Sequence, residues 1–202
     1  QGIGLMREIL FLAHRVPWPP DRGDKIRSFH ILNKLKTLAP VHVGAFADDA
    51  RDMGFAERER AGLASLHAEL RDKPQWLAGI EALARDKPVS LTSFGSRTMQ
   101  DWVDERLATG RISHVFVFSG QMAQYVPADF DGRLVMDFVD VDSAKFGSYA
   151  GEGGNFMRWI NAREGKKLAA FEAEVASRAD ASLFVSEAEA ARILNTKQEL
   201  EA

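Results

Sequence analysis

Short apolar runs alternate along this chain with longer segments in which apolar residues recur at helical spacing. Residues 8–13 (EILFLA) are apolar after the first, which is typical of a strand buried on both faces of a sheet. From Ile26 to Leu35 apolar residues recur at helical spacing and form the predicted buried side of a helix. A second apolar run follows at residues 41–46. Strand, helix and strand in this order predict a βαβ unit and hence a parallel sheet.

The rest of the chain continues this alternation. A capping-box pattern from Ser186 to Glu189 predicts the start of a short helix, and the glycines of residues 147–155 predict a mobile loop. We therefore expect an α/β fold, a doubly wound, Rossmann-like parallel sheet of about five or six strands. The further helices are expected at residues 55–66, 76–84, 98–107 and 156–179, and the further strands at 66–70, 115–118, 134–136 and 181–185.

The fold class predicts where a ligand would bind. In doubly wound sheets, ligands bind outside the carboxyl ends of the strands. The segments to inspect are therefore those that directly follow the predicted strands, residues 14–25, 46–49, 119–121, 137–143 and 186–187.

Composition narrows the choice of function. The 202 residues can form one large domain or two small ones, and a net charge of −3 argues against non-specific binding of nucleic acid. The chain has no cysteine, which excludes disulfides, cysteine-ligated zinc and a thiol nucleophile. The sequence has no signal-peptide pattern and no apolar run near the roughly 20 residues that cross a bilayer. Residues 1–5 precede the first methionine and are interpreted as an expression remnant, and residues 195–202 as a truncated linker.

The first strand–loop–helix junction is the most informative segment. It has neither the glycine pattern of a dinucleotide site nor that of a P-loop. A single glycine, Gly23, starts the helix, and Lys25 and Arg27 lie in its first turn. Seven basic and three acidic residues occur between Arg7 and Lys36. A helix N-terminus of this kind attracts an anion such as a phosphate. The alternative is a helix-start glycine with a solvated basic face.

Three aspartates follow a buried strand. Asp137, Asp140 and Asp142 are placed to bind a metal, act as a base or accept hydrogen bonds from sugar hydroxyls. Aspartate also favours turns and helix caps, so a structural role stays open. We interpret the three side chains as lining a site rather than as metal ligands.

The histidines and one serine add little further chemistry. Five histidines are scattered singly, without the spacing of a metal site, and only His14 stands at the end of a predicted strand. His30 and His42 are expected to be structural. Ser119 and Gly120 resemble half of a nucleophile elbow, but the full G-x-S-x-G pattern is missing, so a hydrolase is not expected.

One predicted helix has the character of a membrane-surface segment. Residues 158–178 hold five basic side chains against three glutamates, and Phe156 and Trp159 lie at the start of the helix. Such a helix can lie on an anionic membrane. The alternative is that the aromatic side chains are core and the charges a solvated face.

Motifs at both ends of the chain resemble a known family. Residues 9–27 (ILFLAHRVPWPPDRGDKIR) resemble the opening of GT-B glycosyltransferases, specifically the glycosyltransferase family 4-like N-terminal domain. Phe171-Glu172, Ala179-Asp180 and residues 182–189 (SLFVSEAE) are similar to the segment that closes that domain. Residues 19–25 and 137–143 look closest to sugar transferases associated with PEP-CTERM/exosortase exopolysaccharide systems. The resemblance covers residues 6–194.

The resemblance implies a retaining hexosyltransferase that uses a nucleotide-diphosphate sugar as donor and needs neither cofactor nor metal. Residues 6–194 would be the acceptor-side domain, inactive without a donor-binding domain, and would act in the cytoplasm at the inner membrane face on a glycan or lipid-linked acceptor. Asp137 and Asp140 take the place of a catalytic histidine that is common in the family. The implied donor- and acceptor-binding residues are His14, Arg22, Gly23, Asp24, Lys25, Arg27, Ser119, Gln121 and Asp142.

A second function class fits the same residues. A doubly wound domain can use the helix start at Gly23 to bind a nucleotide or another phosphorylated ligand without catalysis. A nucleotide-sugar epimerase or dehydrogenase fits less well, because the loop from Pro17 to Gly23 lacks the glycine-rich dinucleotide pattern.

Overall fold

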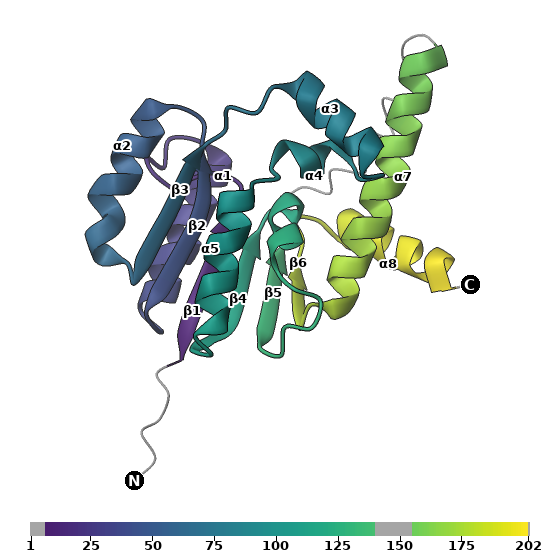
Figure 1. Ribbon diagram of the computed structural model, residues 1–202. Coiled ribbons are helices and arrows are strands. Elements are labelled where there is room, and N and C mark those ends of the chain that lie inside the picture. Colours follow the sequence, from purple (N-terminus) through teal and green to yellow (C-terminus); the bar gives the residue numbers. More distant parts are fainter. Residues whose placement is uncertain (1–6, 140–154, 202) are drawn as a thin grey trace.

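A computed structural model of the chain describes residues 7–139 and 155–201 (Figure 1). All the strand pairs in its six-stranded sheet are parallel, and the strand order is β3-β2-β1-β4-β5-β6. The predicted α/β class with a parallel sheet is therefore confirmed. The strands are β1 (Glu8–Ala13), β2 (Val41–Ala47), β3 (Ser65–Leu70), β4 (Ile112–Phe118), β5 (Arg133–Asp137) and β6 (Ala181–Leu183).

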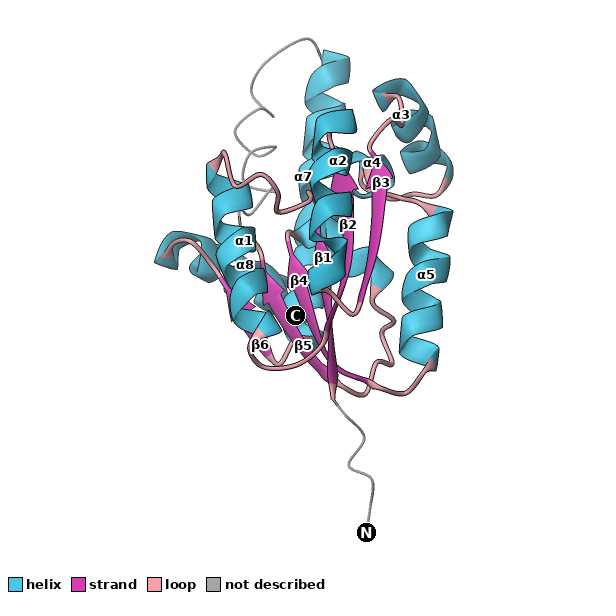
Figure 2. Ribbon diagram, turned by 90° about the vertical axis from the view of Figure 1, so that its left-hand side faces the viewer, coloured by secondary structure: helices cyan, strands magenta, loops and turns pink. Residues whose placement is uncertain are grey.

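Helices cover both faces of this sheet. Figure 2 shows α1 and α5 on opposite sides of the strands. The helices are α1 (Gly23–Lys36), α2 (Ala50–Glu59), α3 (Gln75–Ala84), α4 (Val89–Ser93), α5 (Arg97–Ala108), α7 (Asn155–Arg178) and α8 (Glu187–Glu201), with 3-10 turns η1 (Arg60–Gly62) and η2 (Gly120–Tyr125).

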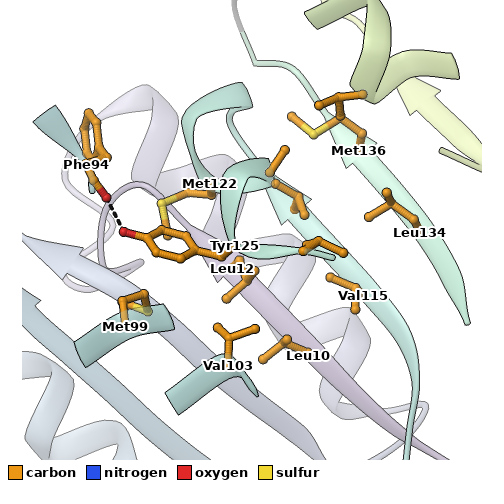
Figure 3. Close-up of a cluster of buried hydrophobic side chains, with 14 of the residues drawn as sticks. Leu10, Leu12, Phe94, Met99, Val103, Val115, Met122, Tyr125, Leu134 and Met136 are labelled. Carbon is orange, nitrogen blue, oxygen red and sulfur yellow. Dashed lines mark hydrogen bonds between the residues drawn. The ribbon is translucent and has the colours of Figure 1, made fainter. Parts of the chain in front are cut away.

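The central strand β1 organises the core. All six of its residues are buried, as its continuous apolar run predicts. Leu10 and Leu12 point into one hydrophobic cluster, and Phe11 belongs to the cluster on the other face. In the first cluster the hydroxyl of Tyr125 donates to the carbonyl oxygen of Phe94 (Figure 3). The sheet is thus packed on both faces around β1, and its strand ends can hold a site.

Two predictions about the first helices are wrong. The second helix begins at Ala50 rather than at residue 55, because the Asp49 side chain caps it by accepting a hydrogen bond from the backbone of Asp52 at 2.8 Å. The predicted buried side of α1 is wrong at one position: Leu32 is buried and Phe29 and Leu35 pack against the core as predicted, but Ile26 is 43% exposed and Lys25 is buried beside it. The cause is Lys25, whose ammonium pairs with Asp52 on α2.

The remaining differences lie in the second half of the chain and at one short helix. The helix α4 was not predicted, and α8 continues to Glu201, through most of the segment interpreted as a linker. One half of the predicted capping box forms: Ser186 Oγ accepts from the backbone N–H of Glu189 at 3.3 Å, whereas the Glu189 carboxylate accepts from the N–H of Val185 rather than of Ser186, at 3.2 Å. Residues 147–154 of the predicted glycine-rich loop lie outside the described residues, and Asn155 already belongs to α7. Among the helices of the described ranges, none is both long enough and apolar enough to cross a bilayer.

Candidate functional site

The carboxyl ends of β1, β4 and β5 meet where the strand order reverses. The chain runs outward from β1 to β3 on one side and from β4 to β6 on the other, so the switch point lies between β1 and β4. His14 directly follows β1 there. Its backbone N–H donates to the carbonyl oxygen of Phe118 at 3.3 Å, and its ring stacks on the Phe118 ring at a centroid distance of 5.9 Å. His14 is therefore at the position where doubly wound sheets bind ligands.

The backbone is strained beside this point. Ser119 has a φ of +84° and Val139 a φ of +62°, and residues other than glycine rarely adopt such positive values. Both are held by Asp137: Ser119 N donates to its carbonyl oxygen at 2.8 Å and Val139 N to its Oδ1 at 3.1 Å. Each such conformation costs on the order of 1–3 kcal/mol and is often found at functional sites.

The N-terminus of α1 opens at the same edge of the sheet. Arg22 occupies the N-cap in an extended conformation, and no side chain in residues 7–139 or 155–201 caps the helix. The backbone N–H groups of residues 23–25 lie in the first turn, so the helix has no carbonyl oxygen one turn earlier to accept their hydrogen bonds. Among the described residues, a Cβ added at Gly23 would meet nothing within 4 Å, so they leave the space beside it open. This end of α1 can receive an anion.

Three arginines, from the loops that follow β1 and β3, surround Asp48, which lies just after β2. Arg15 Nε donates to Asp48 Oδ2 at 2.9 Å, Arg22 donates to the same oxygen at 2.5 Å, and Arg71 lies 3.2 Å from Oδ1. Burial raises the pKa of Asp48, but the three guanidinium groups outweigh it and hold that pKa below its usual value. The result is a charge network across the loops after β1, β2 and β3.

Asp24 and His14 extend this network towards the switch point. Asp24 Oδ2 lies 3.4 Å from His14 Nε2 and accepts a hydrogen bond from Arg15 at 2.8 Å. The hydrogen bond with His14 is the main reason why the pKa of Asp24 lies well below its usual value, and Arg15 adds to it. Over the described residues, His14 Nδ1 is buried and has no hydrogen-bond partner. It is therefore an atom that a ligand can satisfy.

Asp137 and Arg27 form the second charged pair at this edge. Arg27 Nη2 lies 2.9 Å from Asp137 Oδ2, the carboxyl group is fully buried and the guanidinium is partly exposed. Burial raises the pKa of Asp137, opposed by the charge of Arg27 and by the Val139 N–H. A carboxyl group with a raised pKa is suited to general acid or base chemistry.

Two of the predicted site residues face elsewhere or are enclosed. Lys25 is 1% exposed; its Nζ donates to Asp52 Oδ2 at 2.7 Å and to the Trp18 carbonyl at 3.4 Å, so it ties α1 to α2. Gln121 is buried in η2, where it accepts a hydrogen bond from the Ser119 hydroxyl. Asp140 and Asp142 lie outside the described residues. The structure brings together His14, Arg22, Gly23, Asp24, Arg27, Ser119 and Asp137 at one edge of the sheet.

Sequence reasoning missed three members of the network. Arg15 and Asp48 lie in the segments that follow predicted strands, yet nothing marks them as partners because they are 33 positions apart. Arg71 directly follows β3. The useful signal would have been one charged residue immediately after each of several parallel strands, since those positions converge in space.

The described residues contain no group of three or more histidine, aspartate or glutamate side chains that could hold a metal ion. Comparison of the chain with protein-family models, with curated proteins and with solved structures gave no match.

Proposed function

We propose that this chain is the N-terminal, acceptor-side domain of a retaining GT-B glycosyltransferase. It would transfer a sugar from a nucleotide-diphosphate donor to a glycan or lipid-linked acceptor. One observation carries the proposal: the uncapped N-terminus of α1 lies at the same sheet edge as His14 and Asp137, which follow β1 and end β5. The terminal motifs that resemble the family 4-like domain support the same assignment.

The donor diphosphate is assigned to the start of α1. The backbone N–H groups after Arg22 and the helix dipole favour negative charge there, and the open space beside Gly23 admits a phosphate. Stabilising the leaving diphosphate is the main electrostatic demand of the transfer. The chain supplies part of that stabilisation, and a donor-binding domain of the same enzyme would supply the rest.

Asp137 is assigned to the reaction centre together with His14. Its buried carboxyl group has a raised pKa and is held by Arg27 and by the strained turn at Val139. It can therefore accept a proton from an acceptor hydroxyl or orient that hydroxyl. His14 offers a second polar contact through Nδ1, which has no hydrogen-bond partner in the described part of the chain.

The test is release of nucleoside diphosphate from a panel of UDP- and GDP-sugars, with a lipid extract as acceptor. The protein made from the complete gene is assayed beside the 202-residue chain. We expect release by the former, and a loss of at least about a hundredfold with Gly23→Trp, because the indole would block the helix N-terminus.

Gly54→Trp is the matched control. A Cβ added at Gly54, in α2, also meets nothing within 4 Å, so the same bulk is added at an equally open helical position. Release that is equally weakened by both variants would contradict the assignment of the diphosphate to α1.

The alternative is a module that binds a nucleotide or another phosphorylated ligand without catalysis. The uncapped start of α1 favours it equally, because anion binding there needs no reaction. Binding of nucleotides that Gly23→Trp abolishes, with no release from any donor, would establish this second function.

A further inference from the structure

Helix α3 buries its small side chains and exposes its large apolar ones, the reverse of the usual pattern for a surface helix. Its small residues Ala78 and Ala82 are fully buried, whereas its large apolar residues face outward. Helices on a protein surface normally bury their large apolar side chains. The outward residues form an apolar stripe made of Trp76 (67% exposed), Leu77 (41%), Ile80 (58%) and Leu83 (61%).

The apolar stripe lies at the same end of the molecule as the candidate site. The chain enters α3 only a few residues beyond the carboxyl end of β3, and Figure 1 shows α3 above the strands, next to the upper part of α7. The connecting segment contributes to both places: Arg71 pairs with Asp48 in the candidate site, and Lys73 bonds to Glu81 on α3 at 2.9 Å.

A basic cavity adjoins α3. It has a volume of about 430 Å³, and its charged lining comprises Lys73, Arg85, Lys87, Arg97 and Glu81. Glu81 pairs with Lys73 at 2.9 Å and with Arg85 at 2.8 Å, so a single carboxylate of the lining faces two of the four cations. In the described part of the chain, no hydrogen bond or salt bridge within 4.0 Å joins the Lys87 ammonium to another group, although its charge acts on Glu81.

The local charge is opposite to that of the whole chain. Arg97 also pairs with Asp101 at 2.9 Å, and the lining remains positive when this carboxylate is counted. The chain as a whole carries −3. A positive cavity beside an exposed apolar stripe complements a surface that is anionic at its boundary and apolar beneath.

We propose that the apolar stripe and the basic cavity form one docking surface for a bilayer that contains anionic phospholipids. Trp76 and its apolar neighbours enter the boundary between head groups and acyl chains, where tryptophan is enriched. The cavity receives a lipid phosphate, with Lys87 as the cation that is free to bind it.

Charge argues for lipid rather than for a second copy of the chain. A symmetric dimer through α3 would set the two copies of the apolar stripe, and hence the two basic cavities, close together. Like charges brought together in this way oppose association. An anionic membrane satisfies the apolar and the charged part of the surface at once.

The surface extends the proposed function without depending on it. If the acceptor is lipid-linked, docking through α3 brings the carboxyl edge of the sheet to the membrane from which the acceptor is drawn. This consequence rests on the proposed function, whereas the docking itself is tested without any sugar donor.

The experiment is co-sedimentation of the chain with vesicles of phosphatidylcholine alone or mixed with phosphatidylglycerol. We expect sedimentation with the mixed vesicles that weakens as salt is added, since charge contributes. Leu83→Gln should weaken it on the order of tenfold, the effect of losing one buried leucine side chain. Lys87→Glu should weaken it by a similar factor.

Two variants serve as matched controls. Leu38 is 65% exposed at the end of α1, so Leu38→Gln removes an equally exposed leucine from another place. Lys34→Glu reverses an exposed charge on α1. Both should bind the mixed vesicles as the unchanged chain does.

Three results would overturn the proposal. One is no sedimentation with the mixed vesicles, and another is equal weakening by Leu38→Gln and Leu83→Gln. The third is a dimer in solution that Leu83→Gln dissociates and that excludes vesicle binding, which would assign the apolar stripe to a second copy. Absence of sugar transfer leaves the vesicle result unaffected, so the two proposals fail separately.

Discussion

A histidine lies beside a carboxylate both where the strands begin, at the amino edge of the sheet, and where they end, at its carboxyl edge. The two histidines differ in how many of their ring nitrogens have a hydrogen-bond partner among the described residues. At the amino edge, His42 Nε2 lies 2.8 Å from Glu8 Oε2 and its Nδ1 lies 2.7 Å from Ser65 Oγ. At the carboxyl edge, His14 Nε2 faces Asp24, while its Nδ1 is buried without a hydrogen-bond partner in the described structure.

This difference in hydrogen bonding indicates that the cluster around His42 is structural and that the cluster around His14 can bind a ligand. The amino-edge histidine uses both ring nitrogens, as is usual for polar groups buried in a stable fold. In the described structure, the carboxyl edge combines a buried ring nitrogen without a hydrogen-bond partner, two residues with positive φ and a carboxyl group of raised pKa. Changes at the amino edge should therefore alter stability alone, and changes at the carboxyl edge should alter ligand binding.

The largest effect on stability is expected from Lys25, which the sequence pattern places in the site and the structure places in the core. Lys25→Met leaves the carboxylate of Asp52 buried without its 2.7 Å partner. We expect the free energy of unfolding in urea to fall by about 3 kcal/mol. Lys34→Met, on the exposed side of the same helix, should change it by less than about 0.5 kcal/mol. Equal effects would mean that the buried pair does not stabilise the fold.

The amino edge supplies the second prediction. His42→Leu removes the partner of Glu8 and should lower the free energy of unfolding by about 2 kcal/mol, because a buried carboxylate loses a hydrogen bond. Nucleotide binding, followed by isothermal titration, should stay unchanged. A weaker affinity in this variant would break the distinction between the two edges.

Asp137→Asn should separate stability from function at the carboxyl edge. Because burial raises the pKa of Asp137 above its ordinary 3.8, the folded state binds more protons than the unfolded state at pH values between the two pKa values. Stability is therefore lost as pH rises through that window. The asparagine variant lacks this loss, so its stability should fall less than that of the unchanged chain as pH rises through the window.

The same substitution should abolish nucleoside diphosphate release, because an amide cannot accept the proton. Urea unfolding between about pH 3 and about pH 8 covers the window in which a carboxyl group titrates, and it checks the stability part. If the free energy of unfolding changed with pH in the same way in the variant and in the unchanged chain, Asp137 would not be the titrating group.

The smallest effect is expected on α3. Leu83→Gln changes a side chain that is 61% exposed, so the free energy of unfolding should move by less than about 0.5 kcal/mol. Thermal unfolding measures this directly. A loss above about 2 kcal/mol, as for a buried leucine, would show that the side chain is covered within the chain itself.

The local sequence pattern was enough to predict the strands, but it could not predict the charge network around Asp48. The apolar runs predict β1 and β2 because a strand buried on both faces needs no polar positions. The burial of Lys25 on α1 could not be predicted, since a lysine is buried only when a partner such as Asp52 comes from another helix. For the same reason, His14 could be singled out by its place after a strand, but its neighbours Asp24 and Arg15 could not be paired with it.

The assignment of function to the carboxyl edge is best tested by finding where a nucleotide-diphosphate sugar perturbs the chain. Backbone amide shifts are recorded by NMR while UDP- or GDP-sugar is added at millimolar concentration. We expect shifts at Gly23 and Asp24 and at Ser119, and none at His42 or Ser65. Shifts confined to the amino edge, or none at the start of α1 with any donor, would contradict this assignment.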